Sequence, residues 1–522
     1  MSGGHVFITM GDITHLECDA WLLPTDERPE ITPGWFEALP ELRERLARTD
    51  VASLRAGDAQ AVPLAPGGDG PAIVLATVPL NGVLNATGVE HIETSVREFV
   101  ECAAHMAAAP RHERSKRLLA LPSFGTGKGG GAHLRGELAE RLLDVCAEMA
   151  SAHDVDLAIV LRDERSFARM QELRKRRDGW HGALTVEQFA EAGRLAARAK
   201  AGRLVPFLGA GTSISAGAPS WSQLLVRLGE RIGLTADEQE ALRAWGELDR
   251  AAFLRQRAIA EHVRTGGTEQ EGAAAFSQAV VELVDVRRYG LAPALLASLR
   301  TPQAITLNYD GLFEAASTDV GTPRVTIPHS ESGAESGPWL LKLHGSVDEP
   351  SSIVLTRDDY LGYATQREAL SAIVKANLLT HHLLFVGFGL SDEHFHRIVH
   401  DVRRALPPHI SMEERATALT LTEDTIASTL WRGQVRMLPV GSGPKDGRAV
   451  EVFLDVVVAL ATDAHSYLLA DDFATSLNPG ELRLRDALLT LRDEVEKIPT
   501  GTGGRDRVLE LLHDFGGWDD GR

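Results

Sequence analysis

The sequence predicts an α/β protein with two α/β domains and a helical tail. Short apolar runs of strand length alternate with longer amphipathic stretches of helical periodicity through most of the chain. Glycine-rich segments follow two of these apolar runs, as they do in parallel sheets that bind phosphates. The length of 522 residues exceeds what one hydrophobic core supports.

The composition limits the possible partners and compartment. The formal net charge of −19 argues against nucleic acid or an anionic membrane as the main partner. The basic run at 174–177 is therefore interpreted as a solvated helix face rather than a nucleic-acid patch. Three widely spaced cysteines form neither a disulfide framework nor a metal knuckle, so no metal is expected. Because no signal peptide or membrane-spanning run is recognised, we expect a cytoplasmic protein.

Strand-like runs in the first domain, expected over 1–165, lie at 6–10, 20–23, 72–76, 118–121 and 157–161, with helices at 90–106 and 134–149. This alternation predicts an α/β/α sandwich around a mostly parallel sheet. Two loops in it are candidates for nucleotide binding. Asp12 and Ile13 follow the first strand, and the glycine-rich loop after the fourth contains Gly125, Thr126, Gly127 and Gly129. Such a loop can wrap phosphates, but glycine content alone fits a surface loop equally well.

A charged segment at 166–183 is expected to be a linker, and the second domain should span 184–465. Its first strand, 204–208, leads into Gly209, Ala210, Gly211, Thr212 and Ser213, ahead of an amphipathic helix. Gly209 and Gly211 would let phosphates approach the backbone. A Gly-x-Gly alone is compatible with an ordinary tight turn.

Three later strands end in polar or glycine-rich motifs. Asn308 and Asp310 follow 304–307, and His344 follows 339–343. The third strand, 383–386, delivers Gly387, Phe388, Gly389, Ser391 and Asp392. Each motif alone has a structural explanation, such as a turn or a hydrogen-bonding histidine. Because the carboxyl ends of parallel strands meet at one edge of a sheet, we expect all four motifs to form one ligand site.

The segment 236–299 is predicted to be a helical insert. The tail 466–522 is predicted to form two helices that serve packing or oligomerisation.

The order of motifs in the second domain resembles the sirtuin fold, and in particular the divergent sirtuin-like domains of bacterial antiphage defence. The loop 209–213 looks like the family's pyrophosphate loop, and Asn308 with Asp310 resembles its Asn-x-Asp. His344-Gly345 matches the catalytic His-Gly, and 386–392 the loop that contacts the other half of the dinucleotide. The resemblance implies a Rossmann-like sirtuin-fold domain. The four-cysteine zinc ribbon of deacylating members is missing, because no cysteine follows Cys146; Tyr360 and Tyr363 lie in the short segment that replaces it.

The first domain resembles the macro domain, a module that binds ADP-ribose. In that family an aspartate after the first strand contacts adenine, which here corresponds to Asp12 followed by Ile13, and the loop 122–127 resembles the later phosphate loop. Pro24-Thr25-Asp26 and 31–36 replace the asparagines and the first glycine loop of the active members. The resemblance therefore implies nucleotide binding by a macro-like domain, and makes ADP-ribosyl hydrolysis doubtful.

Together these resemblances imply an NAD hydrolase that releases nicotinamide and ADP-ribose as an antiphage effector regulated through the macro-like domain. Asn308 would position water or ribose, and His344 would act as general base. Asp310 would contact the nicotinamide side, while NAD is the substrate and no zinc is needed. Self-association into a homo-oligomer is expected. Two alternatives remain: a protein ADP-ribosyltransferase or deacylase, and a non-catalytic nucleotide sensor.

Overall fold

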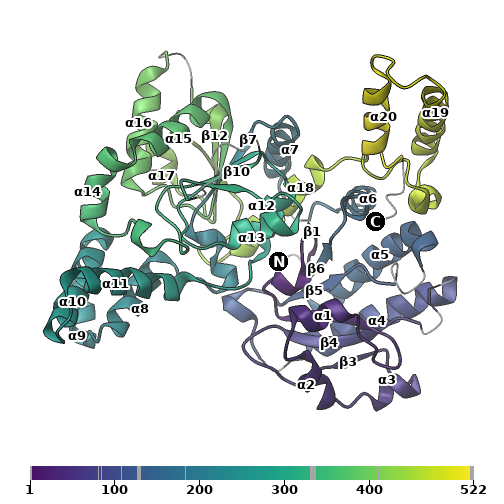
Figure 1. Ribbon diagram of the computed structural model, residues 1–522, viewed down its shortest axis with the longest axis horizontal. Coiled ribbons are helices and arrows are strands. Elements are labelled where there is room, and N and C mark those ends of the chain that lie inside the picture. Colours follow the sequence, from purple (N-terminus) through teal and green to yellow (C-terminus); the bar gives the residue numbers. More distant parts are fainter. Residues whose placement is uncertain are drawn as a thin grey trace. The chain divides into compact units, whose positions relative to one another are not determined.

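The computed structural model describes residues 3–79, 82–83, 85–106, 108–125, 131–182, 184–329, 337–407, 409 and 411–517. Its backbone contacts divide the chain into two compact units, one of Met1–Thr185 with Asp455–Arg522 and one of Val186–Leu454. Each unit is built on its own sheet (Figure 1). No helix in the described part of the chain is long and apolar enough to cross a membrane.

The first unit contains a six-stranded sheet in the order β1-β6-β5-β2-β4-β3. All strand pairs are parallel except β3 with β4. The strands are β1 (Val6–Met10), β2 (Ala20–Thr25), β3 (Ala61–Pro63), β4 (Ala72–Thr77), β5 (Leu118–Pro122) and β6 (Asp156–Leu161). The helices are α1 (Pro33–Ala38), α2 (Leu42–Ala47), α3 (Ala52–Ala56), α4 (Ala86–Ala104), α5 (Arg135–His153) and α6 (Glu164–Lys175). The central strands β6, β5 and β2 are largely apolar because both faces are buried.

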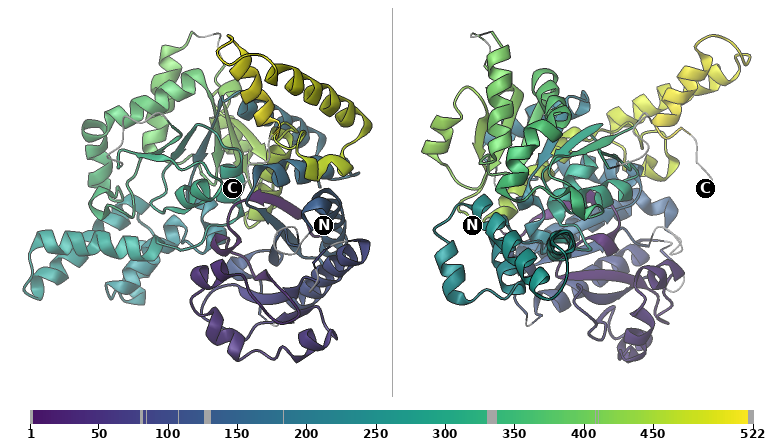
Figure 2. Two further views of the ribbon diagram at one scale, coloured as in Figure 1. Left: turned by 45° about the vertical axis from the view of Figure 1, so that its right-hand side comes forward. Right: turned by 60° about the vertical axis from the view of Figure 1, so that its left-hand side comes forward.

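The C-terminal segment belongs to this first unit. It contains the 3₁₀ turn η8 (Asp471–Ser476) and the helices α19 (Pro479–Glu496) and α20 (Arg505–Asp514), which lie side by side (Figure 2). The structure thus differs from the expected domain division, in which 184–465 form one domain and the tail is an appendage. The segment expected as a linker also differs, because most of it is α6, packed against β1 and α5.

The basic run at 174–177 is not a purely solvated face. Arg174 is buried and donates to the buried carboxylate of Asp455 at 2.6 Å, which His5 also contacts at 2.7 Å. Arg176 pairs with Glu481 and Arg177 with Asp144. The interpretation as a solvated face was wrong for Arg174 because its acidic partner lies 281 positions away in the sequence.

The second unit contains a seven-stranded, fully parallel sheet in the order β13-β12-β11-β7-β8-β10-β9. Its strands are β7 (Leu204–Leu208), β8 (Gln303–Thr306), β9 (Val325–Ile327), β10 (Trp339–Lys342), β11 (His382–Val386), β12 (Ala416–Thr420) and β13 (Arg436–Pro439). The helices near the sheet are α7 (Val186–Lys200), α12 (Leu291–Ser298), α13 (Leu312–Asp319), α14 (Arg357–Gln366), α15 (Glu368–Thr380), α16 (Glu393–Ala405) and α17 (Thr425–Leu430). A further helix, α18 (Gly447–Ala461), contains the last residues of the second unit and, from Asp455, residues of the first unit.

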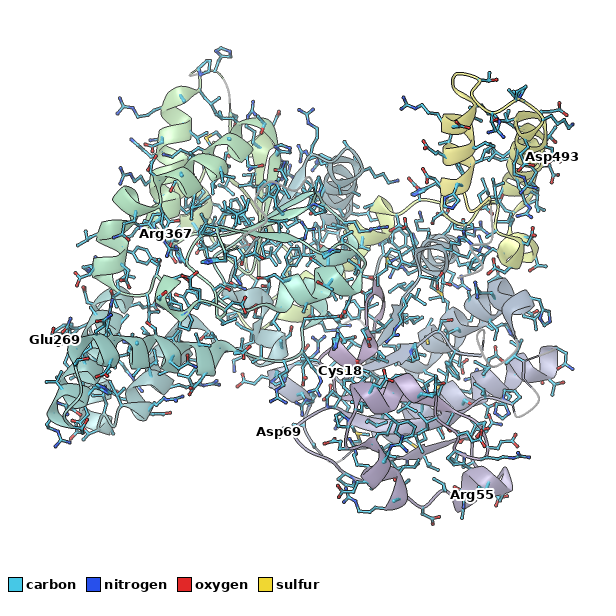
Figure 3. All side chains as sticks on the ribbon, viewed as in Figure 1. Cys18, Arg55, Asp69, Glu269, Arg367 and Asp493 are labelled. Atoms are coloured by element: carbon cyan, nitrogen blue, oxygen red, sulfur yellow. The ribbon has the colours of Figure 1, made fainter. Side chains whose placement is uncertain are left out.

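The segment expected as a helical insert, 236–299, contains α9 (Ala236–Leu242), α10 (Glu247–Arg264), α11 (Glu269–Val284) and α12. The first three form a lobe together with the preceding helix α8 (Trp221–Arg231). Capping boxes at Ser220, Thr235 and Thr268 satisfy the first N–H groups of α8, α9 and α11. Leucines of α8 and Phe276 of α11 share one apolar core, while Glu269 lies at the outer end of the lobe (Figure 3).

Candidate functional site

Four neighbouring strands deliver the predicted motifs to one edge of the second sheet. The strands β11, β7, β8 and β10 are adjacent and parallel, so the loops after them emerge together. They border a cavity of about 420 Å³. Among the predicted residues, those lining it are Gly209, Ala210, Ser213, Asn308, Asp310, His344, Gly387, Phe388, Gly389, Ser391 and Asp392. Gly211 and Thr212 do not line it.

Protein packing requires a glycine at position 211. Its N–H donates to the carbonyl of Gly387 at 2.9 Å, and a Cβ placed on it would lie 2.7 Å from the Gly387 Cα. Gly387 adopts a φ of +65°, which favours glycine. The two glycine loops therefore interlock through their backbones. The approach of phosphates to Gly211 stays a prediction beside this packing requirement.

The side-chain amide nitrogen of Asn308 is hydrogen-bonded within the protein, whereas its amide oxygen has no described partner. Its Nδ2 donates to Ser213 Oγ at 3.1 Å and to Thr212 Oγ1 at 3.3 Å. Its Oδ1 is buried and has no donor within the part of the chain that the structure describes. A buried acceptor without a donor is costly, so the side chain is set up to accept a hydrogen bond from a bound molecule.

A buried ammonium holds the Asn308–Asp310 loop in place. Lys342 is fully buried, and its Nζ donates to the Tyr309 carbonyl at 3.0 Å, to the Asp310 carbonyl at 2.6 Å and to Glu314 at 2.7 Å. The Asp310 carboxylate accepts from Ser213 Oγ at 2.9 Å. Burial raises the pKa of Asp310, and the positive charge of Lys342 offsets only part of that rise.

His344 is buried and neutral at physiological pH. Its residual exposure is 4%, and burial lowers the pKa of its imidazole to about 4. Its Nε2 lies 3.7 Å from Asp392 Oδ2, beyond hydrogen-bond distance, and has no hydrogen-bond partner in the described residues. A neutral, partner-free imidazole can accept a proton.

A small aromatic wall stands beside His344. Tyr360 donates its hydroxyl to Asp392 at 2.6 Å. The ring of His394 stacks between Tyr360 and Tyr363, with centroid distances of 4.2 and 3.8 Å. Burial opposes the charged form of Asp392, but the proximity of His344 and the Tyr360 hydroxyl bring the pKa of this carboxyl below its usual value.

The sequence analysis missed the apolar side of the cavity. That side comes from the helical lobe, and its residues are Trp221, Leu224, Leu248 and Val284. The amphipathic periodicity of α8 indicated that an apolar face exists. Periodicity does not tell which surface that face covers, so the sequence carried no signal for this contact.

Only some residues of the two predicted nucleotide loops of the first unit belong to the described part of the chain. A cavity of about 370 Å³ is lined by Ile13 and by the segments where the sequence departs from the macro family, including Pro24 and Trp35. Asp12 instead caps a short 3₁₀ turn, accepting from Thr14 N at 2.9 Å, and pairs with Arg162. Gly125 packs on Val83 with a φ of +84°, and Thr126, Gly127 and Gly129 lie outside the described residues.

The second unit has a Rossmann-like fold with a cavity at the carboxyl edge of its parallel sheet, which is where ligands bind in such folds. Residues 302–432 match the SIR2-like domain family, so this unit is sirtuin-like, as the motif order predicted.

Curated relatives align with less than half of their own length. "NAD(+) hydrolase ThsA" of Enterococcus faecium is 30% identical over 227 residues, which is 42% of this chain and 43% of the relative. "Defense-associated sirtuin 2" of Bacillus subtilis is 28% identical over 39% of this chain and 19% of its own length. "NAD(+) hydrolase ThsA" of Bacillus cereus is 27% identical over 38% of this chain and 40% of its own length.

The chain was also compared with solved structures. The macrodomain of Mycobacterium tuberculosis DarG aligns with 30% of this chain and 98% of its own, with a TM-score of 0.22 and 17% identity. The macro-like interpretation of the first unit therefore continues to rest on its sequence motifs.

Proposed function

We propose that the protein hydrolyses NAD to nicotinamide and ADP-ribose in the cavity of the second unit. The observation that carries this proposal is the pair of buried atoms without partners, Asn308 Oδ1 and His344 Nε2, on residues that line one cavity beside a glycine loop. The names of the relatives from Enterococcus faecium and Bacillus cereus support the same reaction.

In the proposed reaction the bond between the ribose C1′ and the nicotinamide nitrogen breaks, and its electron pair leaves with nicotinamide. The ribose passes through an oxocarbenium-like state, as in glycoside cleavage. Asn308 Oδ1 accepts a hydrogen bond from the attacking water or the ribose. The water oxygen bonds to C1′, and its proton passes to the neutral imidazole of His344. The loop at Gly209–Ser213 holds the pyrophosphate.

The biological role that we propose is antiphage defence, in which depletion of NAD stops the infected cell. The relative named a defence-associated sirtuin supports this setting. An unregulated NAD hydrolase would harm its own host. We therefore propose that an ADP-ribose-like nucleotide bound to the macro-like first unit controls activity in a cytoplasmic homo-oligomer.

The direct test measures nicotinamide and free ADP-ribose released from NAD by the purified full-length protein, alone and with extracts of infected cells. Hydrolysis yields the two products in equal amounts, whereas transfer to an acceptor yields nicotinamide without free ADP-ribose. His344→Ala should lower the rate at least about 100-fold, the scale of a lost general base. Its NAD affinity should largely persist. Release of nicotinamide by the variant at the parent rate would refute the assignment of His344.

A further inference from the structure

Three side chains with metal-binding atoms converge at the aromatic wall beside the catalytic cavity. One ligand atom each from His344, Asp392 and His394 lies within 4.8 Å of the other two. His344 follows β10, whereas Asp392 caps α16 and His394 lies in its first turn. Because His344 is far from the other two in sequence, residue spacing does not reveal this cluster.

The hydrogen-bond pattern leaves the lone pairs of both imidazoles available. His394 Nε2 lies 3.1 Å from the Tyr360 carbonyl, which only accepts, so this nitrogen carries the proton. The lone pair of His394 is therefore on Nδ1, which is buried and has no partner within the described parts of the chain. His344 Nε2 is likewise buried without a described partner. Two buried imidazole nitrogens without described partners, in one cluster with a carboxylate, are the kind of groups that a bound ligand would satisfy.

The surroundings resemble the outer shell of a metal site. Metal-binding histidines commonly donate their second N–H to a backbone carbonyl, as His394 does to Tyr360. The carboxylate of Asp392 is oriented by the Tyr360 hydroxyl and by the N–H of Phe395 at 2.9 Å. Stacking between Tyr360 and Tyr363 restricts the orientation of the His394 ring.

We propose that His344, Asp392 and His394 bind a divalent transition metal of the zinc class, and that its binding blocks NAD cleavage. Two imidazoles and one carboxylate match the ligands of zinc sites with three protein ligands and one open position. Magnesium and calcium prefer oxygen ligands and fit poorly. Tetrahedral ligands at roughly 2.0–2.1 Å from zinc lie about 3.3 Å apart, so separations of up to 4.8 Å between the three groups must shorten when the ion binds. The inhibitory part rests on the proposed function, because the metal would occupy the nitrogen that acts as base.

Metal binding can be tested independently of catalysis. Co²⁺ is titrated into the full-length protein, with the visible d–d absorption of a four-coordinate site as the signal, and Zn²⁺ is then added to displace it. Nicotinamide release from NAD is measured on the same samples, before and after a chelator. The informative variant is His394→Phe, which keeps an aromatic ring between the two tyrosines and removes the ligand nitrogen. His400→Ala, which removes an exposed histidine of the same helix, is the matched control.

We expect one Co²⁺ per chain, displaced by Zn²⁺, and loss of NAD cleavage in parallel that the chelator reverses. His394→Phe should weaken Co²⁺ binding at least about 100-fold, because even loss of an outer-shell partner costs 10- to 100-fold. His400→Ala should bind like the parent. No saturable Co²⁺ spectrum, or equal binding by His394→Phe, overturns the site. Metal binding without loss of NAD cleavage overturns only the proposed inhibition. A Co²⁺ spectrum from a protein that never releases nicotinamide refutes the proposed function, but leaves the metal site intact.

Discussion

His344 is held in the form that proton acceptance requires. Its imidazole is 4% exposed, and the nearby carboxylate of Asp392 offsets only part of the effect of burial on its pKa. The pKa of about 4 means that the neutral form dominates at any pH well above that value. An exposed histidine would instead be half protonated near pH 6.5.

The pH dependence of NAD cleavage should reflect this burial. A base accepts protons only when deprotonated, so kcat/KM should stay level from pH 8 to about 5 and fall as the pH drops through about 4. Initial rates of nicotinamide release across this range are the measurement, with circular dichroism at each pH to exclude unfolding. An inflection of kcat/KM near pH 6.5 would contradict the buried, neutral histidine.

At the scale of elements, the site depends on two glycine loops that contact each other through the backbone. Gly209 N donates to the Val386 carbonyl at 2.9 Å, and Gly211 N donates to the Gly387 carbonyl. The position of the loop after β7 is therefore fixed by the loop after β11. A change at this contact should displace both loops and with them the surfaces that meet the dinucleotide.

Gly211→Val should abolish most NAD binding, because its Cβ would stand 2.7 Å from the Gly387 Cα and would force the loops apart. We expect the affinity, measured by calorimetry, to fall at least about 10-fold, equivalent to about 1.4 kcal/mol. Gly193→Ala serves as control, because a Cβ there meets nothing within 4 Å. Parent-like affinity in Gly211→Val would show that the loops tolerate separation.

The strand ends were predictable from sequence because each apolar run stops at a residue with a distinct chemistry, as at Gly209, Asn308, His344 and Gly387. The three-residue strands β3 and β9 are too short to show alternation, and the sequence analysis did not predict them. The apolar side of the cavity and the His344–Asp392–His394 cluster depend on contacts between segments far apart in the chain. Composition and periodicity describe single segments, so they do not predict which distant segments contact each other.

At the scale of the whole molecule, residues from Asp455 onward belong to the first unit, although they follow the second unit in the sequence. Asp455 supplies the buried charge that His5 and Arg174 require, and Arg169 donates to the Ser476 carbonyl. Residues 1–165 alone would lack these partners. Experiments on the macro-like unit are therefore designed for the full chain.

Asp455→Ala should destabilise the first unit by about 3–5 kcal/mol, because it leaves the buried guanidinium of Arg174 without its counter-ion. Denaturant unfolding followed by fluorescence measures this change. Asp178→Ala, which alters an exposed aspartate of the same unit, should change stability by less than about 0.5 kcal/mol. Equal effects of the two substitutions would mean that the buried pair contributes nothing specific.

The proposed control by a nucleotide requires binding to the first unit. Its cavity of about 370 Å³ is lined by Arg135 and Arg162, which pair with Asp472 and Asp12 and which an anionic nucleotide could contact in their place. Shifting a two-state enzyme from about 1% to 99% active needs a preference of roughly 10⁴-fold for one state. A single small ligand reaches this more readily when it also changes subunit packing, which is why we expect an oligomer.

Calorimetry of the full-length protein with ADP-ribose and its cyclic variants should detect binding, and Arg162→Ala should weaken it at least about 10-fold by removing one cation from the cavity. Arg55→Ala, which removes an exposed arginine of α3 labelled in Figure 3, should bind like the parent. Asp12→Ala should also shift the nucleotide concentration at which nicotinamide release changes, because Asp12 pairs with Arg162 and caps the turn that carries Ile13. If none of these nucleotides binds and none alters NAD cleavage, the first unit acts as a scaffold, and control must act directly on the sirtuin-like unit.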